Sequence, residues 1–504
     1  MNIVFRVDAS NAMGSGHVIR CLTLADALCA AVPDAGIQFV CRSHPGNLVL
    51  YIEQRGYFTT CLPLGDSCFG ENGLPHADWL GASQETDAAE TQSAFRHHDI
   101  DWLIVDHYGI DYHWEQQLRS IVSHIVVLDD LANRKHLCDV LIDQNFVTNF
   151  EHRYEGLVPA EARVFAGPKF ALLRHEFPSL RGVSRQRNGI VHAVLICFGG
   201  SDPNNHTLAV LEALRGYASS LERIDVVVGS SNPHIQSITA ACETLSNAAL
   251  HFSPTNIGEL LMLADLAIGA GGGMNWERAC LGVPSLVFGI AENQSSSIAA
   301  LIEAGCVAGV SHMPMPVPQL IASWLSVLMN NPEFLRGLSR KSAELVDGQG
   351  TRRVVELMIA APITFRHATV DDSENMRTWR NHPSVRGMSW DACEIDQATH
   401  EAWFRKALSD PQRILLVAEC EGRAVGVVRF DLAKPDGVIS VYRVPDSQGR
   451  GLIRQATDWF KENYPNYKRV IAEVLPNNHM SSKAFDAVGY RLIKKTFIVE
   501  MKRT

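Results

Sequence analysis

Short apolar runs alternate with amphipathic stretches over residues 1–145, and this alternation limits the possible folds more than any other feature. The stretches 17–31 and 111–122 have the spacing of helices that bury one face. Alternation of strands and helices predicts a parallel sheet covered by helices on both sides. The predicted strands of this part are 3–7, 37–41, 58–62, 102–106, 124–128 and 139–142.

A second alternating set follows a connector at 146–190 and is closed by helical stretches at 316–331 and 350–361. Two doubly wound, Rossmann-like lobes in tandem predict a ligand cleft between them, at the carboxyl ends of their strands. The strands predicted for the second lobe are 193–198, 224–228, 249–252, 265–269 and 284–288.

The pattern breaks at Ala360-Ala361-Pro362, and Ile363 begins a separate α+β unit with a predicted helix at 453–464. A chain of 504 residues is long enough for about three domains. We therefore predict an α/β protein with domains at 1–185, 186–361 and 362–504. The strands predicted for the last domain are 363–368, 414–420, 424–431, 437–443, 469–475 and 490–500.

The net charge of −10 is unevenly distributed along the chain. From Ile363 onward 22 Lys and Arg residues exceed 18 Asp and Glu residues, whereas 37 acidic residues outnumber 23 basic ones before it. The acidic excess of the part before Ile363 argues against a nucleic-acid partner. The slight basic excess of the last domain suits an anionic cofactor, but it is also ordinary for a protein surface.

The cysteine pattern indicates a reducing compartment. The 12 cysteines are scattered and form no C-x-x-C pair. We therefore expect free thiols, no metal and a cytoplasmic location. The first residues lack the basic start and apolar core of a signal peptide, and no apolar run is long enough to span a bilayer, so we expect no membrane partner.

Four loops that directly follow predicted strands carry residues able to bind an anion or move a proton. They are the stretch 6–22 and the loops 106–109, 199–202 and 269–277. Glycines before a helix expose backbone N–H groups that suit a diphosphate, and His17 adds a group that titrates near neutrality. The alternative for the first loop is a tight glycine turn with a histidine cap.

Acidic and amide side chains near these loops have two interpretations each. Glu277 can accept the hydroxyls of a ribose, or it can be a solvated helix residue. Asp129 and Asp130 can bind a metal as a pair, although capping at a strand end is the interpretation we favour. The amides of Asn293 and Gln294 can orient an amide-bearing sugar or cap the next helix.

Ordered motifs over about residues 1–360 resemble one family, the UDP-sugar hydrolases of pseudaminic acid biosynthesis. These enzymes remove UDP from UDP-2,4-diacetamido-2,4,6-trideoxy-β-L-altropyranose and are similar in fold to the GT-B glycosyltransferase of peptidoglycan synthesis. The motifs are Arg6-x-Asp8-x-Ser10, Gly14-x-Gly16-His17-x-x-Arg20-Cys21-Leu22, Val105-Asp106-x-Tyr108, Leu128-Asp129-Asp130-Leu131-Ala132-Asn133-Arg134, Gly167-Pro168-x-Phe170-Ala171-Leu172-Leu173-Arg174, Gly271-Gly272 with Trp276-Glu277-Arg278, and Asn293-Gln294.

The resemblance implies that His17 is the general base that activates water and that Tyr108 contacts the sugar. Water would attack the anomeric carbon opposite UDP and invert it, while backbone N–H groups stabilise the leaving diphosphate without a metal. The implied substrate-binding residues are Gly16, Arg20, Arg174, Gly200, Ser201, Gly271, Gly272, Gly273, Glu277, Asn293 and Gln294.

Residues 363–504 resemble the GNAT acetyltransferases, whose Q-x-x-G-x-G loop binds acetyl-CoA. The implied acetyl-CoA contacts are Val444, Gln448, Gly449, Arg450, Gly451, Leu452, Asn478 and Ser481. Two positions depart from the family pattern. Ile453 replaces the last small residue of the loop, and Phe485 replaces a tyrosine that protonates the leaving thiolate in many members.

Glu473 is our candidate for the group that takes the proton of the acceptor amine, with a structural role as the alternative. Trp379-Arg380-Asn381 and His400-x-x-Trp403-Phe404 are similar to the subgroup that acetylates the 4-amino UDP-sugar of the same pathway. The resemblances together imply a bifunctional enzyme whose partners are UDP-linked amino sugars and acetyl-CoA. A GT-B glycosyltransferase and a nucleotide-sugar binding module with only the acetyltransferase active are the alternatives, and the oligomeric state is open.

Overall fold

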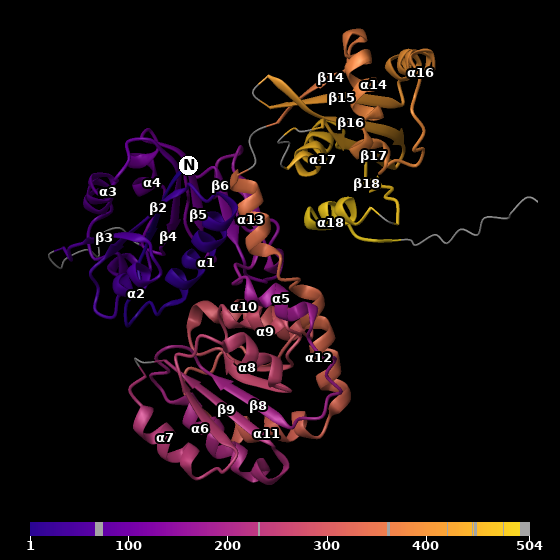
Figure 1. Ribbon diagram of the computed structural model, residues 1–504. Helices are drawn as coiled ribbons and strands as arrows, with labels where there is room; N and C mark the ends of the chain where they lie inside the picture. The colour runs from indigo at the N-terminus through magenta and orange to yellow at the C-terminus, as the bar shows by residue number, and fades with distance from the viewer. Residues whose placement is uncertain are drawn as a thin grey trace, which may run out of the picture. The chain divides into compact units, whose positions relative to one another are not determined.

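The computed structural model describes residues 1–65, 74–229, 232–359, 363–420, 422–445, 447, 451–476 and 478–493. The chain divides into two compact units, Met1–Arg352 and Arg353–Thr504 (Figure 1). The first unit contains two parallel sheets and the second contains one mixed sheet.

The first sheet has seven parallel strands in the order β3-β2-β1-β4-β5-β6-β7. Its strands are β1 (Asn2–Val7), β2 (Gly36–Arg42), β3 (Phe58–Leu62), β4 (Ile100–Asp106), β5 (Val122–Leu128), β6 (Val140–Asp143) and β7 (Arg163–Ala166). The connecting helices are α1 (Gly16–Ala31), α2 (Val49–Gln54), α3 (Gln84–Ser93) and α4 (Tyr112–Leu118).

The second sheet has six parallel strands in the order β10-β9-β8-β11-β12-β13. Its strands are β8 (Ala193–Cys197), β9 (Arg223–Val228), β10 (Ala248–Phe252), β11 (Leu266–Ala270), β12 (Ser285–Phe288) and β13 (Ala308–Val310). Its helices are α5 (Glu176–Gly182), α6 (His206–Leu214), α7 (Ile235–Glu243), α8 (Ile257–Leu263), α9 (Met274–Cys280), α10 (Ser295–Glu303), α11 (Pro318–Met329) and α12 (Pro332–Leu345), followed by α13 (Gly350–Ile359).

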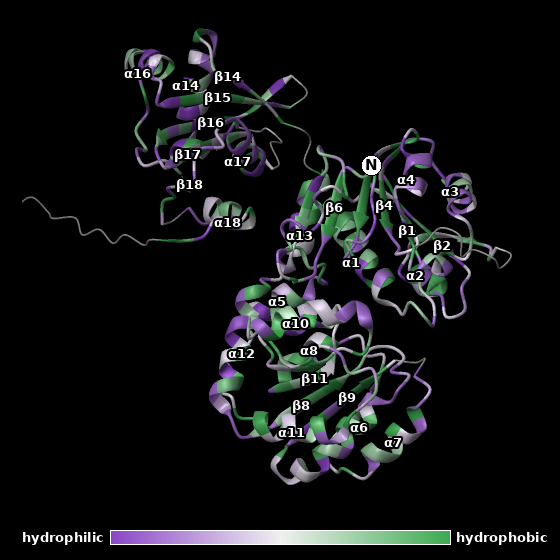
Figure 2. Cartoon of the chain, turned by 180° about the vertical axis from the view of Figure 1, so that it is seen from behind, coloured by the Kyte–Doolittle hydropathy of each residue, from purple (hydrophilic) through white to green (hydrophobic). Residues whose placement is uncertain are grey.

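Both parallel sheets reverse their strand order at one point, between β1 and β4 in the first and between β8 and β11 in the second. The loops that leave the carboxyl ends of these strand pairs diverge to opposite faces of the sheet, and the crevice between them is where doubly wound proteins bind ligands. The central strands are hydrophobic because helices cover both of their faces (Figure 2). Each lobe therefore has one edge at which a site is expected.

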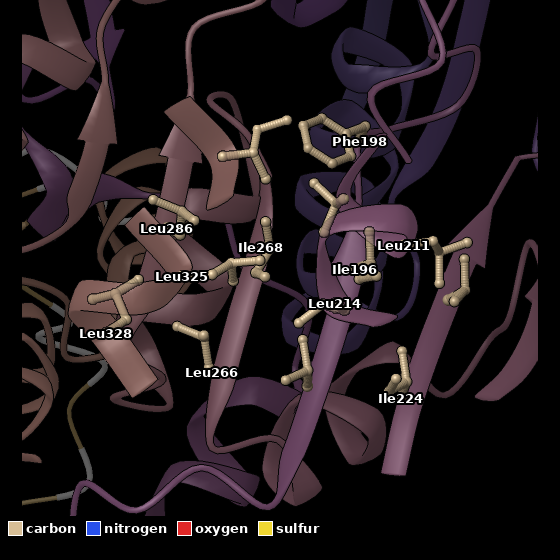
Figure 3. Close-up of a cluster of buried hydrophobic side chains, with 14 of the residues drawn as sticks. Ile196, Phe198, Leu211, Leu214, Ile224, Leu266, Ile268, Leu286, Leu325 and Leu328 are labelled. Carbon is tan, nitrogen blue, oxygen red and sulfur yellow. The ribbon is translucent and has the colours of Figure 1, made fainter. Parts of the chain in front are cut away.

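The core of the second lobe lies between the central strands of its parallel sheet and the helices that cover them. Ile196 and Ile268, from neighbouring strands β8 and β11, are 0% exposed and point toward α6 and α11 (Figure 3). Leu325 and Leu328 of α11 complete this layer, also at 0% exposure. Alternation along each strand sends the next residues, such as Ala267, into the cluster on the other face.

The second unit contains a five-stranded sheet in the order β14-β15-β16-β17-β18, in which only β17 and β18 are parallel. Its strands are β14 (Thr364–His367), β15 (Arg413–Cys420), β16 (Arg423–Ala433), β17 (Asp436–Arg443) and β18 (Arg469–Ala472). Its helices are α14 (Ser373–Asn381), α15 (Pro383–Arg386), α16 (Gln397–Ser409), α17 (Leu452–Asn463) and α18 (His479–Ala487).

The predicted fold class, two doubly wound parallel sheets followed by an α+β domain, is confirmed. Strands β7 and β13, of four and three residues, were not predicted. The strand predicted at 490–500 is wrong for 490–493, which form no strand, and its remainder lies outside the described residues.

Helix α5 lies before the predicted domain boundary at 185/186 but packs against α8 and α9 of the second lobe. Arg181 and Arg187, on either side of that boundary, donate to backbone carbonyls of the second lobe, among them those of Cys280 and Leu281. The division at 1–185, 186–361 and 362–504 remains a prediction.

We expect Leu325→Ala to lower the free energy of unfolding of the first unit by about 2–5 kcal/mol, because it removes a fully buried side chain and leaves a cavity. Val327→Ala, on the same helix at 47% exposure, is the matched control and should change it by less than about 0.5 kcal/mol. Urea unfolding of the full chain measures both. Equal effects would contradict the buried position of Leu325.

Candidate functional site

His17 and Asp106 meet at the carboxyl edge of the first sheet, where its strand order reverses. His17 is the second residue of α1 and Asp106 is the last residue of β4. The Nδ1 atom of His17 lies 2.6 Å from Asp106 Oδ1. The Asp106 carboxylate is fully buried, whereas the His17 side chain keeps 10% of its surface exposed. The loops after β1 and β4 therefore bring the two groups into direct contact.

Arg20, one turn further along α1, donates hydrogen bonds to both oxygens of the same carboxylate. Its Nε donates to Asp106 Oδ2 at 2.5 Å and its Nη2 donates to Oδ1 at 2.6 Å. Burial alone would raise the pKa of Asp106, but the charge of Arg20 and the hydrogen bonds from Arg20 and His17 hold it well below its ordinary value. Asp106 is thus ionised at neutral pH.

The ionised Asp106 fixes the tautomer of His17. A carboxylate only accepts hydrogen bonds, so Nδ1 of His17 must carry the shared hydrogen. In the neutral imidazole the second nitrogen, Nε2, then has a free lone pair and can accept a proton. The arrangement is that of a general base held by a carboxylate.

Tyr108 and Asp130 extend the network. The Tyr108 hydroxyl donates to Asp130 Oδ1 at 2.5 Å, and Arg20 Nη1 donates to Asp130 Oδ2 at 3.1 Å. Burial, with the Asp130 carboxylate beside it, raises the pKa of Tyr108 well above its ordinary value. The phenol keeps its proton, and its ring contacts that of His17 edge to face with the ring centroids 4.7 Å apart.

A second layer of charges lies beneath this network and explains the Arg6-x-Asp8 motif. Arg6 pairs with Asp8 at 2.8 Å and with Asp87 of α3 at 2.6 Å, and all three side chains are fully buried. Asp87 also pairs with Arg42 at the end of β2, while the Arg42 amide donates to Asp8. These contacts fix the end of β1, from which the His17 loop starts.

Two aromatic residues that were not predicted lie against Tyr108. The Trp79 ring is stacked on the Tyr108 ring with centroids 5.7 Å apart, and the His76 ring lies 4.4 Å from Trp79 and 5.4 Å from Tyr108. Both come from the segment before α3. No spacing rule could have found them, because 29 and more residues separate them from Tyr108 in the sequence.

At the corresponding edge of the second sheet, two glycine loops follow β8 and β11. Gly199 and Gly200 are exposed after β8, and Ser201 is partly exposed. Gly272 and Gly273 are exposed before α9, whereas Gly271 is buried and donates its amide to Phe288. The structure thus brings these predicted residues to the expected edge.

Glu277 lies on α9, one turn after the glycines, with 16% of its side chain exposed. Its Oε1 is 3.5 Å from Arg174 Nη2, and Arg174 also pairs with Glu176 at 3.0 Å. Burial raises the pKa of Glu277, and the nearby Arg174 opposes that rise. Arg174 and Glu277 therefore form one partly open charged group.

The predicted amides differ in their surroundings. Gln294 Oε1 accepts a hydrogen bond from the backbone of Ile290 at 3.2 Å, and its side chain lies next to Gly271. Asn293 is exposed. Gly16 opens α1 and is also exposed, without a side-chain cap from Ser15.

The contacts of Asp129 fit the favoured interpretation of a capping group, whereas Asp130 binds Arg20 and Tyr108 of the candidate site. Asp129 is ion-paired with Arg134 at 2.7 Å and accepts hydrogen bonds from Tyr154 and from the amide of Ala132. Among the residues that the structure describes, no group of three or more His, Cys, Asp and Glu side chains could hold a metal ion. The described cysteines are free thiols.

In the second unit, β17 and β18 separate and leave a wedge in the sheet. They pair from Asp436 and Arg469 to Ile439 and Ala472, after which β17 continues to Arg443 paired with β16 but not with β18. Gly451, with a φ of 77°, is the N-cap residue of α17, and Leu452, the first residue of the helix, is buried. Gln448, Gly449 and Arg450 lie outside the described residues.

The remaining predicted residues of this unit differ in their contacts and in their exposure. Val444 follows β17 and donates its amide to Val425. Asn478 is buried and caps α18 by accepting the Ser481 amide at 3.0 Å. Glu473 follows the last residue of β18 and is exposed. Phe485 is buried and contacts the ring of Tyr490 at 4.9 Å.

Comparison with known proteins identifies the second unit. Residues 363–491 match the model of the acetyltransferase (GNAT) domain family. No helix among the described residues is long and apolar enough to cross a membrane.

Curated relatives extend the comparison to the first unit. The chain is 26% identical to the UDP-2,4-diacetamido-2,4,6-trideoxy-β-L-altropyranose hydrolase of Campylobacter jejuni, over 52% of this chain and 81% of that protein. It is 23% identical to a spore coat polysaccharide biosynthesis protein of Bacillus subtilis, over 51% and 76% of the two chains. An uncharacterized protein of Methanocaldococcus jannaschii is 22% identical over 98% of both chains.

Solved structures that are similar to this chain include the MurG protein of Acinetobacter baumannii, which is 15% identical over 71% of this chain and 99% of its own, with a TM-score of 0.46. A spinosyn rhamnosyltransferase is 15% identical over 70% of this chain and 99% of its own, with a TM-score of 0.47.

The curated relative and the family model together show that the chain joins an N-terminal half similar to a UDP-sugar hydrolase to a GNAT acetyltransferase domain.

Proposed function

We propose that this chain catalyses two successive steps on a UDP-linked amino sugar. The GNAT domain transfers an acetyl group from acetyl-CoA to the 4-amino group of the UDP-sugar. The first unit then hydrolyses UDP-2,4-diacetamido-2,4,6-trideoxy-β-L-altropyranose to UDP and the free sugar. The observation that carries the hydrolytic step is the contact of His17 with the buried, ionised Asp106 at the ligand edge of the sheet.

In the hydrolytic step, His17 Nε2 takes a proton from water as the water oxygen attacks the anomeric carbon. The bond from that carbon to the diphosphate oxygen breaks, its electron pair leaves with UDP, and the configuration inverts. Asp106 keeps Nδ1 protonated and stabilises the imidazolium that forms. Arg20 was predicted to bind substrate, but we propose that it positions Asp106 and Asp130, because its guanidinium donates to both.

The second lobe supplies the nucleotide site in this proposal. The exposed glycines after β8 and β11 leave room for a diphosphate beside backbone N–H groups, which can stabilise the departing charge without a metal. Glu277 accepts the ribose hydroxyls, and Arg174 holds Glu277 in place. Asn293 and Gln294 face the sugar. Gly14 and Gly16 let the sugar approach His17 closely.

In the acetyl transfer, the nitrogen of the neutral 4-amino group attacks the thioester carbonyl, an amide bond forms and the C–S bond breaks. Acetyl-CoA supplies the activated acyl group when bound, and the wedge between β17 and β18 with the start of α17 fits it. Exposed Glu473 takes the amine proton through water. Because Phe485 has no proton to give, water protonates the leaving thiolate.

We propose a cytoplasmic location because acetyl-CoA and UDP-sugars are available there and the described cysteines are free thiols. A GT-B glycosyltransferase would need an acceptor, so release of UDP from the diacetamido sugar in water alone separates the two functions. Mass spectrometry of both UDP-sugars incubated with the protein, with and without acetyl-CoA, tests the proposal as a whole.

We expect His17→Ala to lower the rate of UDP release by about 10²–10⁴-fold, the usual contribution of a general base. Acetyl transfer to the 4-amino UDP-sugar should be unchanged. His113→Ala, an exposed histidine of the same unit, is the control. Normal UDP release by His17→Ala would remove His17 from the mechanism.

We expect Asp106→Asn to lower kcat for UDP release by about 10³-fold or more, because the amide does not hold the Nδ1–H tautomer. The free energy of unfolding should also fall at pH 7. The low pKa of Asp106 stabilises the fold above the unfolded pKa, so acidification below about pH 4 should weaken the wild type more than the variant. Asp26→Asn, at a half-exposed ion pair on α1, is the control. A retained kcat would contradict the tautomer argument.

We expect Gly451→Val to raise the KM for acetyl-CoA by about tenfold, because a side chain at the start of α17 obstructs the diphosphate. CoA release that saturates with the 4-amino UDP-sugar is the measurement. Gly422→Val is the matched control, since its φ of 73° gives the same backbone strain away from α17. Equal effects in both variants would mean that strain alone is responsible.

A further inference from the structure

A ring cluster that includes two residues without an assigned role, His76 and Trp79, lies beside His17. It consists of His76, Trp79 and Tyr108, whose ring centroids are 4.4–5.7 Å apart. The imidazole of His17 contacts the Tyr108 ring at 4.7 Å. The Tyr108 ring therefore connects His76 and Trp79 to His17, the proposed base.

The fold brings this cluster to the base by a closed loop. The Gly65 amide donates to the Gly81 carbonyl at 2.9 Å, so the chain leaves and returns at one point beside β2 and β3. The returning segment lies directly on Gly109, where a Cβ would meet the His76 carbonyl oxygen at 2.9 Å. Only glycine at 109 permits this approach.

The cluster is not simply part of the core. Trp114, in the core of the same lobe, is 0% exposed and donates its indole N–H to Asp87. His76 and Trp79 instead stay partly exposed. A tryptophan that remains accessible beside a proposed catalytic base has ring surface to offer a ligand.

The Tyr108 hydroxyl is engaged and the His76 ring is uncharged, so neither ring brings a charge to the cluster. The Tyr108 hydroxyl gives its proton to Asp130. Burial, with the nearby charge of Arg134, lowers the pKa of His76, so its ring is neutral at neutral pH. The faces of the three rings therefore offer apolar surface, while His76 and Trp79 also keep their ring nitrogens as polar atoms.

We propose that His76, Trp79 and Tyr108 form an apolar wall that selects UDP-sugars carrying methyl groups, on C6 and on the acetamido substituents, over sugars with hydroxyls at these positions. This inference rests on the proposed function. A methyl group loses nothing when it leaves water for a ring face, whereas a hydroxyl there loses its hydrogen bonds to water. Trp79 is the residue with most ring surface and sets the preference.

Binding to a His17→Ala protein separates recognition from hydrolysis. Isothermal titration with UDP-2,4-diacetamido-2,4,6-trideoxy-β-L-altropyranose, with a UDP-sugar that has hydroxyls at C4 and C6, and with UDP alone gives three affinities. We expect Trp79→Ala to weaken only the first, by about tenfold, as for other losses of an apolar contact. Trp79→Phe should restore most of it. Trp390→Ala, an exposed tryptophan of the second unit, should change none.

Unchanged affinity of Trp79→Ala for the first sugar would overturn the inference. Equal weakening for both sugars and UDP would also overturn it, because it would show a structural role. If the selective loss is observed but the wild type releases no UDP, the apolar wall stands and the hydrolytic function fails. If the wild type binds none of the three ligands, both fail.

Discussion

A single buried carboxylate, Asp106, organises the first lobe's edge. It has no solvent to stabilise its charge, so it must be surrounded by donors, and α1 supplies them from two successive turns through His17 and Arg20. Because β4 ends at this residue, the position of the helix relative to the sheet and the tautomer of the histidine are fixed by the same contacts. Removing the charge would disturb both.

The network continues outward from this carboxylate. Arg20 also donates to Asp130, which in turn holds the Tyr108 hydroxyl, so groups from the loops after β1, β4 and β5 form one connected set. Beneath it, the pairs of Arg6 with Asp8 and Asp87 join β1 to α3. Within each layer the carboxylates are paired with arginines, which permits ionised groups to remain buried at the site.

The sequence allowed the sheets to be predicted well because strands covered on both faces are continuous apolar runs, as in Ala193 to Cys197. It also indicated that His17 and the loop with Tyr108 share an edge, since strand ends in a parallel sheet do. It could not indicate that Arg20 is bound to two carboxylates. That contact joins residues 86 and 110 positions apart, and an arginine near a glycine loop is equally suited to a phosphate. Trp79 was missed for the same reason.

The hydrogen bond between Gly65 and Gly81 has a consequence for how such a protein can change. This hydrogen bond joins the two ends of the loop, so the loop is attached to the sheet at the same place whatever residues it carries. Substitutions at His76 or Trp79 can then accumulate without altering the strands or the carboxylate that orients His17. Preference for a sugar and the ability to break its bond are thus separable by evolution, and the loop is the place where a new preference would be acquired.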